Sequence, residues 1–267
     1  MHVWSMQYQS NEHMKKIIEC GLSVTLIIAG VFSGWKVYQY LKDRNAARNI
    51  NNAVQETVKE NDNNNADEAG SDPGFSASDW NSLKGQNPDF IGWLQFDSGL
   101  LAQPVVQGTD NDFYLKHGFE KQYSSYGTVF MDHMNKKSDT NQIIYGHYVY
   151  FDDQAMFSQL TALIDQNSYD ANKTFKIYYQ DQTCSYQICY IYDFDSEDYG
   201  RYDYQQMNFS SQEEFDDWIQ YPTEKNLIYS DDQIKYGDKF VTLQTCRPWH
   251  PEQRIILLCK QKEKEMN

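Results

Sequence analysis

Hydrophobic and polar positions divide the chain into three regions. Residues 17–41 are mostly apolar. Residues 42–74 are predominantly polar, and from Phe75 onward short apolar runs alternate with turn-forming residues. The pattern therefore predicts a hydrophobic segment, a spacer and a folded domain over residues 75–267.

The apolar region is long enough to cross a membrane. A transmembrane helix needs about 20 apolar residues, and no charged side chain lies between Glu19 and Lys36. We therefore expect a transmembrane anchor over residues 17–41, preceded by a cytoplasmic N-terminus over residues 1–16. A cleaved signal peptide is the alternative, because Met14 and the two lysines after it resemble its basic start. Met14 is also a second candidate for the initiator.

Residues 42–74 are expected to form a polar, flexible linker. Residues 44–60 fit a polar helix, whereas residues 61–74 contain almost no apolar side chain. A stretch of that composition cannot bury enough apolar surface to fold. The linker would let the folded domain stand away from the membrane.

Eight short apolar runs in the folded region predict β-strands. Turn-forming residues separate the runs, a pattern typical of an all-β barrel or sandwich. The 21 tyrosines also favour strands. The expected strands cover residues 91–96, 103–107, 128–131, 142–145, 174–179, 184–194, 239–246 and 255–258.

Three helices are expected beside these strands. A short one covers residues 76–83, and a second covers residues 152–164 with apolar side chains on one face. The third begins at a capping box formed by Ser211 and Glu214 and stops at Pro222. This third helix lies between the sixth and seventh strands.

Composition limits the possible partners. The net charge of −15 argues against binding duplex nucleic acid, because that binding depends on Lys and Arg neutralising phosphates. Such acidity instead keeps an exposed domain soluble. Acidic pairs such as Asp231 and Asp232 lack the spacing of a calcium loop, so no metal and no other cofactor is expected.

The five cysteines do not indicate a disulfide framework. Cys184 and Cys189 lie on one expected strand at odd spacing, so their side chains point to opposite faces. These two residues and Cys259 are expected to be small, buried hydrophobic side chains. Cys20 falls in the apolar segment.

Cys246 ends an apolar run with the sequence TLQTC, where a strand passes into a loop that contains two prolines. Arg254 begins the next strand, so the two side chains can lie side by side across a hairpin. His147 ends another strand at a Gly-His corner. A thiolate, an imidazole that titrates near neutrality and a permanently charged guanidinium together suit acyl transfer at a peptide carbonyl.

These three pieces, in this order, resemble the sortases, which are cysteine transpeptidases of Gram-positive cell surfaces. The pattern is a histidine after a strand, a TLxTC strand end and an arginine on the following strand. The chain is similar to class B sortases in particular, and the resemblance covers roughly residues 75–260. Upstream motifs that extend it are Asn87–Trp93, Gln103–Leu115, Gly127–Asp132 and Met156–Leu160.

The resemblance implies a mainly β fold, namely a sortase-type eight-stranded β-barrel with a few peripheral helices, including one between strands 6 and 7. It also implies that Cys246 is the nucleophile, that His147 is the general acid and base, and that Arg254 stabilises developing negative charge. Leu243 and Thr245, which belong to the same motif, are expected to contact the substrate.

Other residues compete for the histidine and arginine roles. The competitors are His117, His133, His250 and Arg247. We prefer His147 for its Gly-His corner and Arg254 for its strand-start position, because both match the family. The structural alternative for Arg254 is a surface ion pair, for instance with Glu252.

The implied reaction is a transpeptidation. The enzyme cleaves a C-terminal sorting motif after Thr through a thioacyl-enzyme intermediate and joins the protein to an amine of the cell-wall precursor. The expected partners are secreted proteins with sorting signals, a peptidoglycan precursor or a pilin amine, and the membrane. The catalytic domain is expected outside the cell on a single-pass anchor, although the basic residues that follow the anchor favour the opposite orientation by the positive-inside rule.

Three alternative functions stay open. A pilin-polymerising sortase differs only in using a pilin lysine as the acceptor. A non-catalytic, membrane-tethered surface-binding domain would keep the scaffold without needing the Cys, His and Arg. A zinc hydrolase that used His147 and Cys246 would need further ligands, which the sequence does not supply at suitable spacing.

Two positions depart from the class B pattern. Tyr148 and Val149 follow the Gly-His corner, where relatives often carry Asn and Met. Pro248 and Trp249 follow soon after the cysteine, where relatives often carry an acidic residue. Both departures lie where a substrate would approach, so they leave the preferred sorting motif open.

Overall fold

The computed structural model describes residues 2–64 and 75–267. Within it, one compact unit ends at Ala46, and a second, which holds the β-strands, begins at Ala47. The helices, α-helical and 3-10, are α1 His2–Asn64, α2 Ala77–Gln86, η1 Phe113–Leu115, η2 Ser158–Ile164, α3 Gln166–Ala171, η3 Ser196–Asp198 and α4 Gln212–Lys225.

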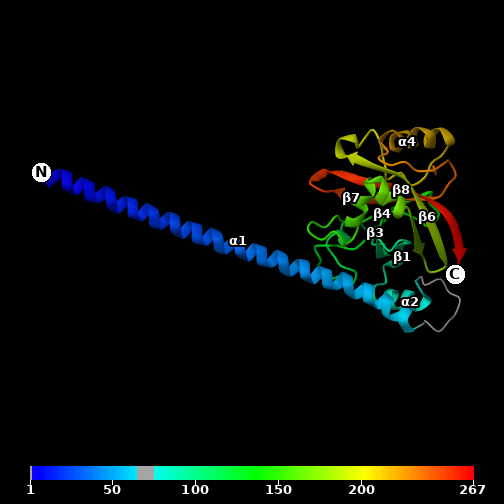
Figure 1. The fold of residues 1–267 in the computed structure, drawn as a ribbon, viewed down its shortest axis with the longest axis horizontal. Helices are drawn as coiled ribbons and strands as arrows, with labels where there is room; N and C mark the ends of the chain where they lie inside the picture. The colour runs from blue at the N-terminus through cyan, green and yellow to red at the C-terminus, as the bar shows by residue number, and fades with distance from the viewer. Residues whose placement is uncertain (1, 65–74) are drawn as a thin grey trace. The chain divides into compact units, whose positions relative to one another are not determined.

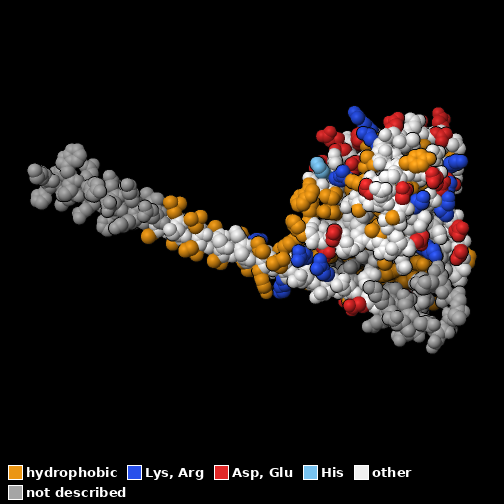
Figure 2. All heavy atoms as spheres, in the orientation of Figure 1, with side chains coloured by type: hydrophobic (Ala, Val, Ile, Leu, Met, Phe, Trp, Pro, Cys, Tyr) orange, Lys and Arg blue, Asp and Glu red, His pale blue; other side chains and the backbone are white. Residues whose placement is uncertain are grey.

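The first unit contains only the N-terminal part of α1 (Figure 1). Among the described residues, one helical stretch, Cys20–Glu56, is long and apolar enough to cross a membrane, and none of its most apolar window is buried. Hydrophobic side chains lie uncovered along this part of the helix (Figure 2). The helix therefore presents an apolar surface of the kind that lipid would cover.

The later part of α1 occupies much of the region that we expected to be a flexible linker. Ala47 and Val54 are buried in the second unit. Arg48 forms an ion pair of 2.9 Å with Asp152, and Gln55 donates a hydrogen bond to the backbone carbonyl of Ala102. This stretch is therefore helical and packed on the strand-containing unit. Residues 65–74 of the expected linker lie outside the described residues.

The predicted eight-stranded β-barrel is confirmed. The strands close in the order β1-β2-β3-β4-β7-β8-β6-β5. The β2–β3 and β4–β7 pairs are parallel, and the other neighbours are antiparallel. The strands are β1 Phe90–Phe96, β2 Ala102–Val106, β3 Phe130–Met131, β4 Asn141–Tyr145, β5 Thr174–Tyr178, β6 Gln182–Asp195, β7 Phe240–Arg247 and β8 His250–Met266.

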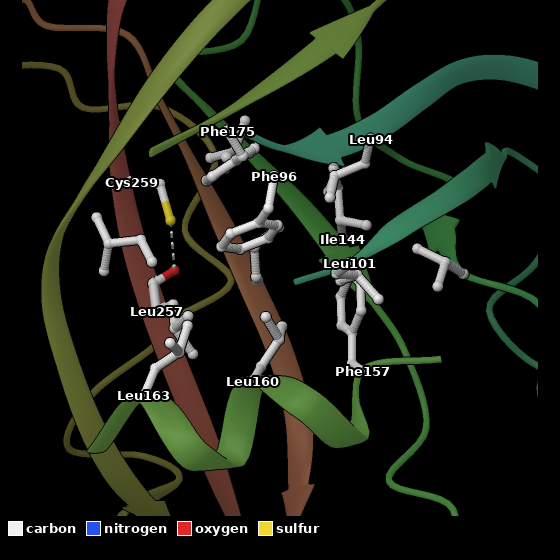
Figure 3. Close-up of a cluster of buried hydrophobic side chains, with 14 of the residues drawn as sticks. Leu94, Phe96, Leu101, Ile144, Phe157, Leu160, Leu163, Phe175, Leu257 and Cys259 are labelled. Atoms are coloured by element: carbon white, nitrogen blue, oxygen red, sulfur yellow. Dashed lines mark hydrogen bonds between the residues drawn. The ribbon is translucent and has the colours of Figure 1, made fainter. Parts of the chain in front are cut away.

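The barrel interior forms the main hydrophobic core (Figure 3). Alternate side chains of each strand point inward, and aromatic and aliphatic groups from β1, β4, β5 and β8 meet there. Cys259 is fully buried in this core and donates a weak hydrogen bond to the Leu257 carbonyl at 3.7 Å. Cys184 lies in the same core, and Cys189 lies in a second cluster outside the barrel, so the opposite-face prediction is confirmed.

Two of the expected helices differ from the observed ones. Residues 152–164 do not form one helix, because the 3-10 helix η2 begins only at Ser158 and Met156 adopts a left-handed backbone with φ 48°. Such a conformation cannot continue a right-handed helix. Leu160 and Leu163 are still fully buried as expected, since a spacing of three places them on one side of a 3-10 helix.

The helix between β6 and β7 is confirmed, but it does not stop at Pro222. α4 runs to Lys225 with Pro222 inside it. Proline lacks the N–H that would bond to the carbonyl four residues earlier, which costs one helical hydrogen bond. Pro222 shares the buried face with Phe215 and Trp218, and burial of that face offsets the loss.

Candidate active site

Strand β7 lies between β4 and β8 and aligns the three candidate catalytic residues. In the parallel β4–β7 pair, Tyr145 is the partner of Gln244, and the Gly146 N–H donates to the Gln244 carbonyl at 3.0 Å. Continuing this register by two residues brings His147 beside Cys246. The sequence-distant histidine and cysteine therefore become neighbours through strand pairing alone.

The antiparallel pairing on the other side of β7 positions the arginine. The Cα of Cys246 faces the Cα of Arg254 across the β7–β8 hairpin, and a bulge follows directly between Cys246 and Arg247. Side chains of directly opposed residues lie on the same face, with Cβ atoms about 4.5–5.5 Å apart. Cys246 is thus flanked by an imidazole-bearing segment on one side and a guanidinium on the other.

The three residues line one cleft on the outside of the barrel. The floor and walls of this cleft are mostly aromatic and amide side chains, and Cys246 is only partly buried. Its lining residues are Asn111, Leu115, Phe130, Tyr145, Gly146, His147, Tyr199, Tyr204, Gln205, Gln244, Cys246 and Arg254. The thiol is therefore accessible to a peptide, unlike the buried cysteines.

The imidazole of His147 is held by a backbone carbonyl. Its Nε2 lies 2.8 Å from the Leu115 carbonyl oxygen. A carbonyl only accepts, so Nε2 carries a proton and Nδ1 is the basic nitrogen of the neutral ring. The segment beneath the ring needs glycine at 127, where φ is 64° and an added Cβ would lie 2.5 Å from the Tyr114 carbonyl and 3.1 Å from His147 Cδ2.

The Gly-His corner is fixed by packing on an aromatic ring. An added Cβ at Gly146 would lie 2.4 Å from Cγ of Phe157, which is fully buried. The Phe157 N–H also donates to the His147 carbonyl at 3.1 Å. Only glycine lets the strand end approach the ring this closely, so the corner sets the position of the histidine.

Arg254 is among the residues that line the cleft. Its Nη1 donates to the carbonyls of Pro251 at 2.7 Å and Gln253 at 2.9 Å, which braces the first residues of β8. The competing Arg247 instead pairs with Asp193 at 3.5 Å, away from the cleft lining. Burial raises the pKa of Asp193 even though Arg247 lies nearby.

The competing histidines have other contacts. His117 stacks on Phe113 with ring centroids 3.9 Å apart. His133 lies 3.6 Å from Asp132. His250 lies 3.5 Å from Glu252, the ion-pair partner named in the structural alternative for Arg254. Of the four histidines in the described barrel unit, His147 is the one that lines the cleft.

The structure does not bring Leu243 and Thr245 to the cleft. Both side chains are 0% exposed, and Leu243 belongs to the barrel core. Alternation along β7 explains this, because Gln244 and Cys246 point outward, whereas Leu243 and Thr245 point inward. Neither residue has a surface with which it could contact a substrate in this structure.

A buried polar network beneath the cleft was not anticipated from the sequence. Asp132 is 4% exposed and accepts hydrogen bonds from the Tyr145 hydroxyl at 2.7 Å and from Asn111 Nδ2 at 2.8 Å. Burial and this carboxylate raise the pKa of Tyr145, so its hydroxyl stays protonated. Gln205 also donates to that hydroxyl. Asp132 ends a recognised sequence motif, but its partners come from separate segments.

The remaining cysteines of the barrel unit are poorly suited to react. Cys184, Cys189 and Cys259 are each 1% exposed or less. Burial raises the pKa of all three thiols, that of Cys189 to about 12. In the described part of the chain, no three His, Cys, Asp or Glu side chains are grouped so that they could hold a metal ion, and the zinc alternative therefore has no ligand set there.

Comparison with known proteins identifies a family for this chain. The Sortase domain family matches residues 97–262. Sortase B of Listeria monocytogenes is 28% identical over 233 residues, which cover 85% of this chain and 89% of that protein. The X-ray structure of Clostridium perfringens sortase B is 30% identical with a TM-score of 0.63, covering 69% of this chain and 100% of that one. A Staphylococcus aureus sortase B–substrate complex shares the fold at 24% identity, with a TM-score of 0.69 over 83% of this chain and 99% of that one.

The Gly146→Ala variant should lose stability. Its Cβ would overlap the Phe157 ring, and overpacking of this kind costs about 1–3 kcal/mol. Urea denaturation of the full chain in detergent would measure the change in free energy of unfolding. Gly85→Ala is the matched control, because its Cβ meets nothing within 4 Å and Ala at a compatible site stabilises by about 0.4–1 kcal/mol. Equal stability of Gly146→Ala and the unchanged chain would contradict the packing argument.

Iodoacetamide should label Cys246 well before the buried thiols. The full chain would carry Cys20→Ser, and mass spectrometry of peptides taken at intervals near pH 7 would follow each cysteine. Raised pKa values and burial keep the other three thiols protonated and covered, whereas Cys246 faces the cleft. Labelling of Cys189 at a rate similar to that of Cys246 would refute this difference.

Proposed function

The chain belongs to the sortase family, as a class B-type cysteine transpeptidase, and from this premise we propose that Cys246, His147 and Arg254 carry out its acyl transfer. The main support for the proposal is the pairing of β7 with β4 on one side and with β8 on the other. The registers of these two pairs bring the segments that carry the three groups to one cleft. The Cys246 position, partly buried at the outer face, suits a nucleophile.

In the first half-reaction, the Cys246 thiolate attacks the carbonyl of a Thr in the sorting motif. The S–C bond forms, and the carbonyl becomes a tetrahedral oxyanion that Arg254 stabilises, together with the backbone N–H of Arg247. The C–N bond then breaks, and His147 in its imidazolium form gives a proton to the departing amine. The product is a thioacyl enzyme and a free C-terminal fragment.

In the second half-reaction, an amine attacks the thioester carbonyl. Neutral His147 accepts a proton from the attacking nitrogen, the C–S bond breaks, and the Cys246 thiolate is regenerated beside the imidazolium. The new amide joins the target protein to the acceptor. The starting state of the enzyme is restored, so no cofactor is consumed.

The substrates follow from the family. The donor is a secreted protein that carries a C-terminal sorting motif, and the acceptor is an amine of the cell-wall peptide precursor. Residues 17–41 act as a single-pass membrane anchor that keeps the catalytic domain at the outer surface of the cell. The uncovered apolar surface of α1 supports this assignment.

Cys246→Ala should abolish covalent capture of a sorting-motif peptide. Without the thiol no thioester can form, so intact-mass spectrometry of the full chain should find no peptide adduct. Cys184→Ala is the matched control, because that thiol is buried in the barrel core, and it should still form the adduct. An adduct on the Cys246→Ala chain would show that another group is the nucleophile.

Arg254→Ala should slow thioester formation by about 10²–10³-fold, the usual effect of losing one oxyanion donor. Rapid-quench measurement of the peptide adduct separates this step from binding. Arg201→Ala is the control, since the Arg201 side chain is 85% exposed and should leave the rate unchanged. If Arg254→Ala reacted at the normal rate, the oxyanion role would be withdrawn.

A further inference from the structure

Four aromatic side chains on the segments that follow His147 and Cys246 form one cluster, which we call the aromatic cap. It consists of Tyr148, Tyr150 and Phe151, which follow His147, and Trp249, which follows Cys246. The two departures from the class B sequence pattern each contribute to it, through Tyr148 and Trp249. The cap therefore joins the two loops that leave the proposed catalytic histidine and cysteine.

The four rings contact one another in series. The Tyr148 and Tyr150 centroids are 5.0 Å apart in an edge-on arrangement, and those of Tyr150 and Trp249 are also 5.0 Å apart. Phe151 packs edge-on to Trp249 at 6.3 Å. The backbone N–H of Trp249 donates to the Tyr150 hydroxyl at 3.3 Å. These distances fit attractive aromatic pairs, so the cap is an organised surface.

The outer part of the cap is exposed to a degree that folding alone does not favour. Phe151 is 72% exposed and Trp249 is 71% exposed. Both residues also adopt φ 63°, the left-handed region that side chains other than Gly, Asn and Asp rarely enter. The backbone thus holds two large apolar rings outward at a conformational cost, and such strain gathers where a contact with another molecule is made.

The aromatic cap is linked to α1 through the residue that follows Phe151. Asp152, which follows Phe151, is 5% exposed and accepts hydrogen bonds from Arg48 Nε at 3.0 Å and from the Tyr126 hydroxyl. Arg48 lies only seven residues after Leu41, the end of the apolar segment, and seven residues span at most about 25 Å. Chain connectivity therefore limits how far the aromatic cap can lie from the apolar segment.

We propose that Phe151 and Trp249 contact the interface of the phospholipid bilayer in which the chain is anchored. The inference rests on the membrane anchor of the proposed function. Tryptophan and other aromatic rings favour the headgroup region, and the tether keeps the cap within reach of it. With a net charge of −15, general attraction to anionic lipid cannot hold the domain there, so an apolar contact is needed. The contact holds the loops that follow His147 and Cys246 at the bilayer surface.

Tryptophan quenching in vesicles tests this contact. The full chain and its Trp249→Phe variant are reconstituted in phosphatidylcholine vesicles, with and without lipid brominated on its acyl chains, and the difference between the two emission spectra isolates Trp249. We expect brominated lipid to remove most of the Trp249 emission and aqueous acrylamide to remove little. Quenching by acrylamide without quenching by brominated lipid would overturn the proposal.

A polar variant and a matched control sharpen the result. Phe151→Asn removes one ring, and asparagine tolerates a left-handed backbone, so Trp249 should lose most of its quenching by brominated lipid. Tyr229→Asn removes an equally exposed ring, 74% exposed, and should change nothing. Equal effects of the two substitutions would contradict the proposal.

A sugar chain is the competing occupant, because rings can also stack on sugars. If a soluble peptidoglycan disaccharide shielded Trp249 from acrylamide while brominated lipid had no effect, the cap would be a glycan site and the membrane contact would be rejected. The quenching experiment does not measure transpeptidation. A negative quenching result therefore does not contradict the proposed reaction, and an adduct on the Cys246→Ala chain does not contradict the membrane contact.

Discussion

The cleft depends on hydrogen bonding of β7 to a strand on each side. The parallel pairing with β4 carries His147 to the level of Cys246, and the antiparallel pairing with β8 puts Arg254 opposite the thiol. Side chains alternate between the faces of a strand, so a slip of one residue would turn Cys246 into the barrel and Thr245 outward. The positions of the three proposed catalytic groups therefore depend on the strand register, and the contacts that fix this register also position the groups for reaction.

The barrel core supplies that restraint. Ile144, Leu243 and Leu257, one from each of the three strands, are fully buried in the same cluster, and a slip would expose all three to water. Burial stabilises by about 25 cal/mol per Å² of apolar surface, so wrong registers are strongly disfavoured. At the strand ends, contacts of single residues restrain the site. Gly146 packs on Phe157, and the Leu115 carbonyl holds the imidazole. Burial in the barrel interior thus fixes the register of the strands, and close contacts at the strand ends fix the positions of the side chains at the cleft.

Polar groups beneath the cleft also hold residues of its lining in place. Asp132 is almost fully buried, and its carboxylate accepts hydrogen bonds from Tyr145 and Asn111, which both line the cleft. A buried carboxylate without such partners would be costly, so the network holds its own members in place. The aromatic cap joins the loops after His147 and Cys246. Tyr150 packs on both Tyr148 and Trp249 and so links the two sequence departures, which only the folded chain reveals.

The sequence by itself determined the class of fold, the eight strands, the helix between β6 and β7, and the reactive types of residue at strand ends, because periodicity and turn residues act locally. It also indicated an apolar segment near the N-terminus. The end of α4, the broken helix before η2, the burial of Leu243 and Thr245, and the packing of Ala47 and Val54 were decided by tertiary structure. Each depends on which distant surface covers the segment. A local pattern specifies that a face is apolar, but the partner that buries it comes from elsewhere in the chain.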